Sequence, residues 1–365
     1  MTLGDYFRIR YNRQTELLLS ICIIVSYLGW VSAQITALGL TFNVLSNDLI
    51  STHQGMLIGA GVVLIYTLFG GMWSVALTTF VQMIVIVIGL LLVTQNAADQ
   101  AGGIAQVFAK AAAEGKFEWL PSMDALDILG WAAALMTMAL GSIPQQDVFQ
   151  RVMSSGSERT AIRSCFYAAG LYLTVAMLPL FISLCTKHLY PDQLTGDLQL
   201  SLPRMVLAHM PLWVQVVFFG SLLSAIMSTT SSAILAPAAI LSENIIKPVF
   251  REKISDKKLL LITRVSVLLF SAIATVMATT RNNIYELVGE SSVVSLVSLF
   301  IPLTLGLYWP SSTGKGAIAG MFTGILSWFL FKWVDTGVPE LVPATLISLV
   351  TMVAVSIYQR NKTSI

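Results

Sequence analysis

Charged residues are scarce in this chain, and that scarcity excludes most soluble folds. Only 11% of its 365 residues are Asp, Glu, Lys or Arg, whereas 56% are hydrophobic. A soluble domain carries about 25% charged residues. The composition therefore excludes a large soluble domain and predicts a chain embedded in a lipid bilayer.

Histidine and cysteine are also rare, with three of each. Their scattered positions have no metal-binding spacing and no disulfide framework. No Ser-His-acid set, paired catalytic carboxylates or phosphate-binding glycine loop can be assembled from the sequence. We therefore expect neither an enzyme nor a metalloprotein of the His/Cys type.

Long apolar segments occupy most of the chain. They predict an all-α, polytopic membrane protein in a single domain over residues 1–365. We expect about ten transmembrane helices, at 16–42, 54–69, 72–96, 126–143, 162–186, 211–236, 259–279, 285–307, 316–334 and 340–358. Gly70-Gly71 is expected to form a tight turn between the second and third. The segment 97–124 is read either as an interfacial helix or as a short packed outer helix.

The distribution of basic residues predicts the orientation. Fifteen of the 21 Lys and Arg residues fall in the segments on the same side as both termini. By the positive-inside rule, both termini are expected to be cytoplasmic, in a multi-pass protein of the cell's inner (plasma) membrane. Because these charges flank the spans one connection at a time, they indicate topology and no nucleic-acid partner.

One apolar segment, Phe218 to Ile245, carries a dense group of hydroxyl residues. Ala225, Ser228, Thr229 and Ser232 are spaced to share one face of a helix. Hydroxyl oxygens can coordinate a small hard cation. The alternative is that these small residues allow close helix packing and bond to their own helix carbonyls.

A second polar segment interrupts the helix expected at 126–143. Gly141, Ser142 and Pro144 break the apolar run, and Gln145 and Asp147 follow. Transporters use the backbone of such broken helices to hold solutes. The alternative is a helix that ends at the membrane surface with Asp147 solvated.

Glu286 and Glu290 precede the apolar run SSVVSLVSLFIPL in the helix expected at 285–307. An ionisable residue within a membrane is a functional candidate. A solvated carboxylate in the first turn of a helix, favoured by the helix dipole, is the interpretation that we prefer.

These segments, in this order, resemble the sodium:solute symporter family. Five stretches carry the resemblance: TLGDYFRIRYN (2–12), the stretch from YTLFGG (66–91), IPQQDVFQRVMSS (143–155), the stretch from LLSAIMSTTSS (222–245) and the stretch from LGLYWPSS (305–320). The resemblance implies a leucine-transporter-like core of two inverted five-helix repeats. It also implies sodium-coupled symport of a small organic solute by alternating access, with no obligatory protein partner.

In the family, the helix equivalent to 222–245 supplies sodium ligands, which match Ala225 through its carbonyl and Ser228 and Thr229 through their hydroxyls. Ser231 and Ser232 match further hydroxyls that some members use for a second sodium. Those members also use an aspartate where this chain has Thr79. A neutral hydroxyl cannot offset a second cation in a low dielectric, so we expect one coupled sodium ion.

By this alignment the chain begins at the third core helix, so the core is expected to lack its first two helices. The sodium site would then lack oxygen ligands, and a transport-inactive fragment is one alternative. A membrane sensor component working with a separate kinase is another. The residues that choline-transporting and sugar-transporting relatives use to bind their solutes are not matched in this chain. Gly141, Ser142 and Gln145 are the expected contacts for a small polar organic solute.

Overall fold

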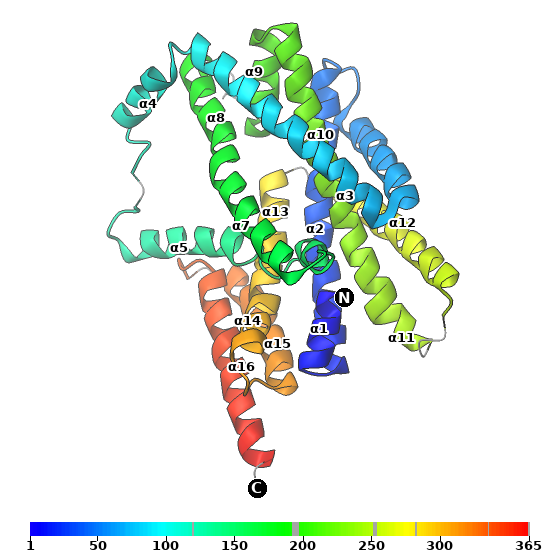
Figure 1. Cartoon of the computed structure of the whole chain (residues 1–365). Coiled ribbons are helices and arrows are strands. Elements are labelled where there is room, and N and C mark those ends of the chain that lie inside the picture. The colour runs from blue at the N-terminus through cyan, green and yellow to red at the C-terminus, as the bar shows by residue number, and fades with distance from the viewer. Residues whose placement is uncertain (119, 192–196, 251–253, 282, 335, 364–365) are drawn as a thin grey trace.

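The computed structural model describes residues 1–118, 120–191, 197–250, 254–281, 283–334 and 336–363, without the side chains of 69–74. Helices make up nearly all of this part of the chain (Figure 1). Their bounds are α1 (Leu3–Arg10), α2 (Arg13–Leu45), α3 (Thr52–Gln100), α4 (Ile104–Ala113), α5 (Ala125–Ala139), α6 (Gln146–Met153), α7 (Glu158–Val175), α8 (Met177–Leu189), η2 (Leu198–Leu200), α9 (Ser201–His209), α10 (Leu212–Ile240), η3 (Leu241–Ile246), α11 (Lys247–Val249), α12 (Asp256–Thr280), α13 (Ile284–Ser295), η4 (Leu296–Phe300), α14 (Ile301–Tyr308), α15 (Gly314–Trp333) and α16 (Leu341–Thr363).

Eight helical segments among the described residues are long and apolar enough to cross a bilayer. Two of the ten expected spans, 54–69 and 126–143, correspond to apolar helical segments that are shorter, Thr52–Leu68 and Ala125–Ala139. The multi-pass, all-helical class is therefore confirmed, whereas the count of ten stays a prediction. The non-helical turn expected at Gly70-Gly71 is wrong, because both residues are helical within α3.

Polar caps define where several helices begin. The Asn12 side chain accepts a hydrogen bond from the Thr15 amide and starts α2. Ser51 and Gln54 form a reciprocal capping box at the start of α3. Such caps satisfy amides that have no partner within the helix, which would be costly to leave unpaired next to hydrocarbon.

The long helix α2 lies in the centre of the bundle and contacts α3, α10, α12 and α13. Small residues bring its backbone close to α13. Gly29 is so near that an added Cβ would lie 3.0 Å from the carbonyl oxygen of Leu287. The hydroxyls of Ser26 and Ser295 are 2.7 Å apart. Small residues and interhelical hydroxyl contacts are the usual means of packing membrane helices.

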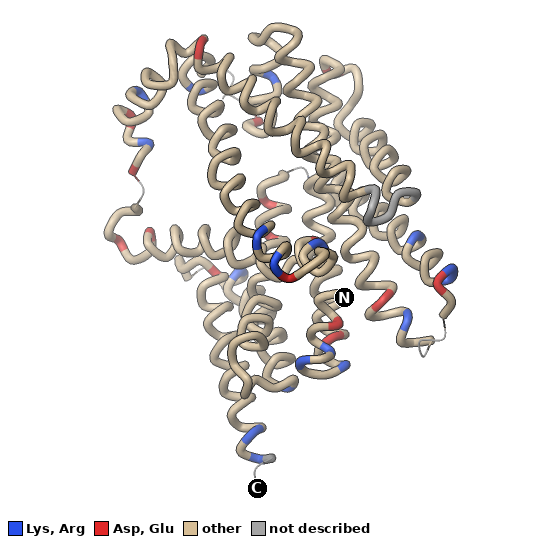
Figure 2. Tube along the Cα trace, viewed as in Figure 1, with Lys and Arg blue, Asp and Glu red and all other residues tan. Residues whose placement is uncertain are grey.

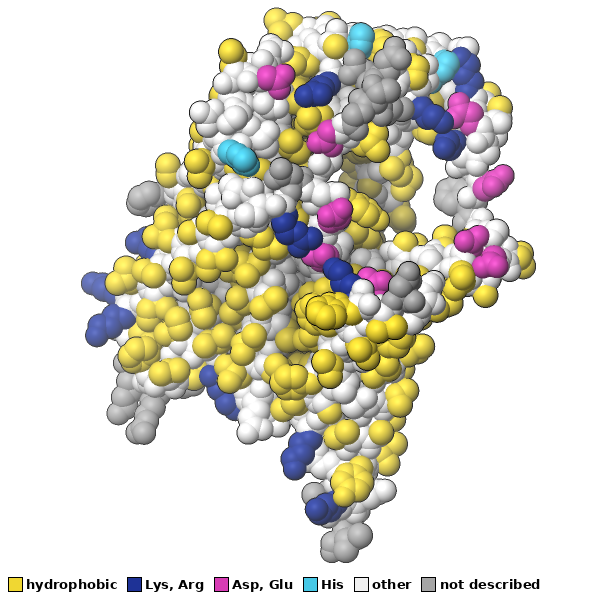
Figure 3. All heavy atoms as spheres, turned by 180° about the vertical axis from the view of Figure 1, so that it is seen from behind, with side chains coloured by type: hydrophobic (Ala, Val, Ile, Leu, Met, Phe, Trp, Pro, Cys, Tyr) yellow, Lys and Arg dark blue, Asp and Glu magenta, His cyan; other side chains and the backbone are white. Residues whose placement is uncertain are grey.

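The connections and the lipid-facing surface agree with a membrane location. Figure 2 shows charged residues mostly at helix ends and in connections, and Figure 3 shows broad hydrophobic areas on the outer surface. In Figure 1 the C-terminus and the α1–α2 connection lie toward one end, and α4 and α9 lie at the other. The short helix α4 buries Val107 and Ala111, and the ring of its Phe108 packs on Phe181 of α8, which agrees with the packed outer helix rather than the interfacial one.

Candidate ion and solute sites

The hydroxyl cluster lies on α10, as expected, and its protons are mostly used within the helix. Thr229 donates to the carbonyl of Ala225 at 3.0 Å, and Ser231 and Ser232 donate to the carbonyl of Ser228 at 3.0 and 3.1 Å. These bonds use the hydroxyl protons and leave oxygen lone pairs available, which is the arrangement that a cation needs. They are also the bonds that the packing alternative predicts, so the hydrogen bonds alone do not separate the two readings.

Ser228 differs from its neighbours because its hydroxyl reaches another helix. It donates to the hydroxyl of Thr79 on α3 at 3.1 Å. Both residues are half-buried. Thr79, which stands where two-sodium members of the family have an aspartate, thus contacts Ser228, one of the predicted sodium ligands.

Ser232 has a charged partner. The guanidinium of Arg151, on α6, donates to the Ser232 hydroxyl. A small hollow beside this contact is lined by Asp147, Gln150 and Leu235 as well. Of the predicted sodium residues, Ala225, Ser228 and Thr229 are therefore better placed than Ser232 to receive a further cation.

The interrupted helix is present. Helix α5 ends at Ala139, turns occupy 140–144, and α6 begins at Gln146. Gly141 is buried within the break, where an added Cβ would lie 2.5 Å from the carbonyl oxygen of Ser292 on α13. Ser142 and Gln145 are half-buried. The break therefore lies against α13, whereas the predicted sodium residues face α3 and α6.

Asp147 is not a solvated surface carboxylate, so that alternative is wrong. The hydroxyl of Tyr27 on α2 donates to the Asp147 carboxylate at 2.5 Å and accepts from the Asp147 amide at 3.1 Å. The preceding Gln146 is fully buried, and its side-chain oxygen accepts from the Leu3 amide at 2.8 Å. These contacts join the start of α6 to α1 and α2. Sequence reasoning missed Tyr27 because one tyrosine in an apolar helix has no distinguishing pattern.

Glu290 is not the solvated carboxylate that we expected in the first turn of a helix. It is bound to Arg281 at 2.6 Å and to Lys332 at 3.0 Å, and its side chain is only 33% exposed. The hydrogen bond with Glu290 raises the pKa of Arg281, which lies outside the membrane-spanning helices. The carboxylate is thus an ion-pair centre that joins α13 to α15.

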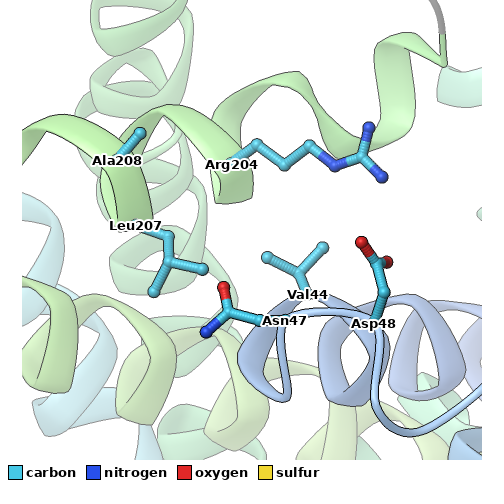
Figure 4. Close-up of a pocket in the computed structure, with 6 residues that line it drawn as sticks. All are labelled: Val44, Asn47, Asp48, Arg204, Leu207 and Ala208. Carbon is cyan, nitrogen blue, oxygen red and sulfur yellow. The ribbon is translucent and has the colours of Figure 1, made fainter.

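A separate hollow of about 350 Å³ lies at the α4 and α9 end of the molecule (Figure 4). Arg204 of α9 and Asp48 of the α2–α3 connection approach it from opposite sides. Asn47 and Asp48 have φ of 49° and 64°, in the left-handed region that Asn and Asp tolerate better than other non-glycine residues. Both charged side chains are exposed, so this hollow is an open surface groove.

A model of the sodium:solute symporter family matches residues 1–324. The chain belongs to that family. It is 30% identical to the human high affinity choline transporter 1 over 334 residues, which cover 89% of this chain and 57% of that protein. It is 29% identical to the high-affinity proline transporter PutP of Bacillus subtilis, over 98% of this chain and 76% of the relative. The family and these relatives are transporters and not enzymes.

The fold agrees with the family. A solved Na⁺-coupled sialic acid symporter in a substrate-bound outward-open state superposes with a TM-score of 0.80 at 17% identity, over 98% of this chain and 77% of that one. This confirms the leucine-transporter-type fold. The chain spans little more than half the length of the choline transporters that it matches.

No group of three or more His, Cys, Asp or Glu residues that could hold a metal ion occurs in the described ranges. A sodium ion at α10 would thus be held by neutral oxygens. The Ala225 carbonyl and the Ser228 and Thr229 hydroxyls fit this chemistry because hard cations prefer oxygen ligands.

Proposed function

We propose that this chain forms the larger part of a sodium-driven symporter that moves a small polar organic solute across the inner (plasma) membrane by alternating access. The observation that carries the proposal is the hydroxyl face of α10. Three of its hydroxyl protons are donated to the helix's own carbonyls, and Ser228 also reaches α3. Membership of the sodium:solute symporter family supports a sodium ion as the ligand of this face.

In this proposal Ala225, Ser228 and Thr229 hold one sodium ion and the broken segment around Gly141, Ser142 and Gln145 contacts the solute. Sodium must bind the outward-open state more tightly than the inward-open state, since equal affinity for both would shift no equilibrium. The solute then binds beside the break, and the helix bundle rocks inward. The chain's own residues supply binding and orientation, and no covalent step is involved.

A stoichiometry of one sodium ion is supported by two features of the second-ion position. Thr79 offers no negative charge there, and the Ser232 hydroxyl already faces the guanidinium of Arg151. A second cation beside Arg151 would be repelled in a low dielectric. Ser231 and Thr79 therefore act as packing contacts in this proposal.

The proposed orientation has both termini in the cytoplasm, on the evidence of the basic residues. The proposed site for sodium lies within a membrane-spanning helix, and the lipid bilayer is the surrounding solvent. No nucleic-acid partner and no obligatory protein partner are proposed.

The test is uptake by the purified chain in liposomes, with an inward sodium gradient or with potassium in its place. Radiolabelled L-proline and choline serve as probes, because relatives transport each. We expect sodium-stimulated uptake of at least one probe, reduced about tenfold or more in Ser228→Ala and Thr229→Ala, since each removes an ion ligand. Ser224→Ala, on the same helix beside this face, is the matched control and should transport normally. Equal uptake with and without sodium would reject sodium coupling, and uptake no higher than that of empty liposomes would favour a transport-inactive fragment.

A further inference from the structure

A cavity of about 330 Å³ lies between α5, α13 and α15, apart from the hydroxyl face of α10. Its size is at the lower end of the range for small-molecule pockets. Figure 3 shows acidic and basic side chains close together near the middle of one face, among hydrophobic areas. The residues that line the cavity include Tyr285, Glu286, Glu290, Trp328, Lys332 and Glu340.

One side of this cavity is formed by the ion-pair centre. Glu290 binds Arg281 and Lys332 at 2.6 and 3.0 Å, so its charge is already balanced. The Lys332 ammonium also lies 5.3 Å from the centre of the Trp328 ring. These side chains link α13 to α15 beside the cavity, and Glu290 is not left to bind a cationic ligand by itself.

Two polar groups of the lining have no partner of their own. Trp328 is 5% exposed, and among the described residues its indole N–H has no hydrogen-bond acceptor. The carboxylate of Glu340 is half-buried and, within the same residues, has no hydrogen-bond or ion-pair partner. A buried donor without an acceptor is costly and calls for an explanation such as a ligand.

The buried indole N–H of Trp328 and the half-buried carboxylate of Glu340 favour opposite charges in a ligand. The indole N–H, with the Lys332 ammonium near its ring, favours a negatively charged acceptor such as a carboxylate. The Glu340 carboxylate, with Glu286 and the Tyr285 ring in the same lining, favours a cation. We infer that the cavity is an outer binding site for a small zwitterion that carries both an ammonium group and a carboxylate.

The position of the cavity gives this binding a role, which rests on the proposed transport function. Thr137 of α5 lines the cavity, and its carbonyl oxygen would lie 2.4 Å from a Cβ on Gly141 in the break. A zwitterion bound between Trp328 and Glu340 would therefore lie beside the segment that is proposed to contact the transported solute. The outer site selects the class of solute before it reaches the break.

The experiment measures equilibrium binding to the purified full chain in lipid nanodiscs, in potassium buffer without sodium. The probes are L-proline and glycine betaine as zwitterions, choline as a cation and propionate as an anion. We expect saturable binding of the zwitterions, with choline and propionate at least tenfold weaker, because each satisfies only one of the two groups. Glu340→Gln should weaken zwitterion binding about tenfold or more, because it removes the negative charge that attracts the ammonium group, and Trp328→Phe about fivefold, because it removes the indole N–H donor.

The control variants make the same types of substitution at residues that do not line the cavity. Trp333→Phe changes an indole that is 89% exposed, and Glu118→Gln changes an exposed carboxylate; both should bind as the parent does. Ser228→Ala should also keep this binding, so a failure of sodium coupling and a failure of the outer site are distinguishable. The inference is overturned by an absence of saturable zwitterion binding, by choline binding as tightly as glycine betaine, or by unchanged binding in either cavity variant.

Discussion

Ser228 of α10 and Thr79 of α3 join the two helices through their hydroxyls, at 3.1 Å. Neither residue carries a charge, although an aspartate at the position of Thr79 is what the two-sodium resemblance would require. The contact explains why α10 and α3 are held together at this depth without a fixed negative charge. It also defines where a charge could be added to change the number of coupled ions.

Thr79→Asp tests that argument. In a low dielectric the new carboxylate would compensate a second cation beside Ser228, so the Hill coefficient for sodium in uptake should rise above one. The measurement is solute uptake into liposomes against sodium concentration. Thr79→Asn is the control, because asparagine has nearly the same shape as aspartate but no charge, and it should leave the Hill coefficient at one. An unchanged coefficient in the aspartate variant would contradict the explanation from charge.

Tyr27→Phe tests the attachment of the broken helix. The phenol both donates to the Asp147 carboxylate and accepts from its amide, and Tyr27 is only 4% exposed. Removing it leaves a charged acceptor and a donor without this partner, which should lower the free energy of unfolding by about 2 to 3 kcal/mol. Chemical unfolding in detergent gives the measurement. The matched control, Tyr167→Phe, alters a tyrosine that is 74% exposed and should change little; a similar loss in both would contradict the assignment.

Gly141→Ala tests the close contact between the break and α13. A Cβ there would lie 2.4 Å from the carbonyl oxygen of Thr137 and 2.5 Å from that of Ser292. Because backbone atoms must move, we expect a loss of about 1 to 3 kcal/mol in stability, with weaker solute uptake. Gly130→Ala lies on α5 with no atom within 4 Å and should be neutral or stabilising by about 0.5 to 1 kcal/mol, since alanine favours the helix. Effects of the same sign and size in the two variants would count against this contact.

Asn244→Ala tests a buried polar cluster that the sequence did not reveal. The Asn244 amide donates to Asp5 at 3.1 Å and to Glu16 at 2.8 Å, and its oxygen accepts from Thr2 at 2.8 Å. Glu16 is fully buried and keeps its ion pair with Arg13 at 2.6 Å, so the change removes one hydrogen bond from a buried charge and should cost about 1.5 to 3 kcal/mol. Thermal unfolding of detergent-solubilised protein measures it. Asn96→Ala, in an exposed pair with Gln100, is the control, and a loss below about 1 kcal/mol for Asn244→Ala would refute the role of the cluster.

The sequence alone determined the class of protein and the position of its main polar features. Apolar length and low charge required a multi-pass helical fold, because hydrocarbon tolerates only helices or closed barrels. Helical periodicity placed Ala225, Ser228 and Thr229 on one face of α10, and glycine and proline placed the break near Gly141. These features are local, since backbone preference and spacing along one helix are sufficient to specify them.

The tertiary structure alone decided the partners of those features. Tyr27 and Asp147 are 120 residues apart in the chain, and no pattern in either segment indicates that they meet. Glu290 was expected to be solvated but lies between Arg281 and Lys332, whose side chains reach it from the α12–α13 connection and from α15. Side-chain spacing along a helix says which residues share a face, whereas the neighbour that the face meets depends on how all the helices pack.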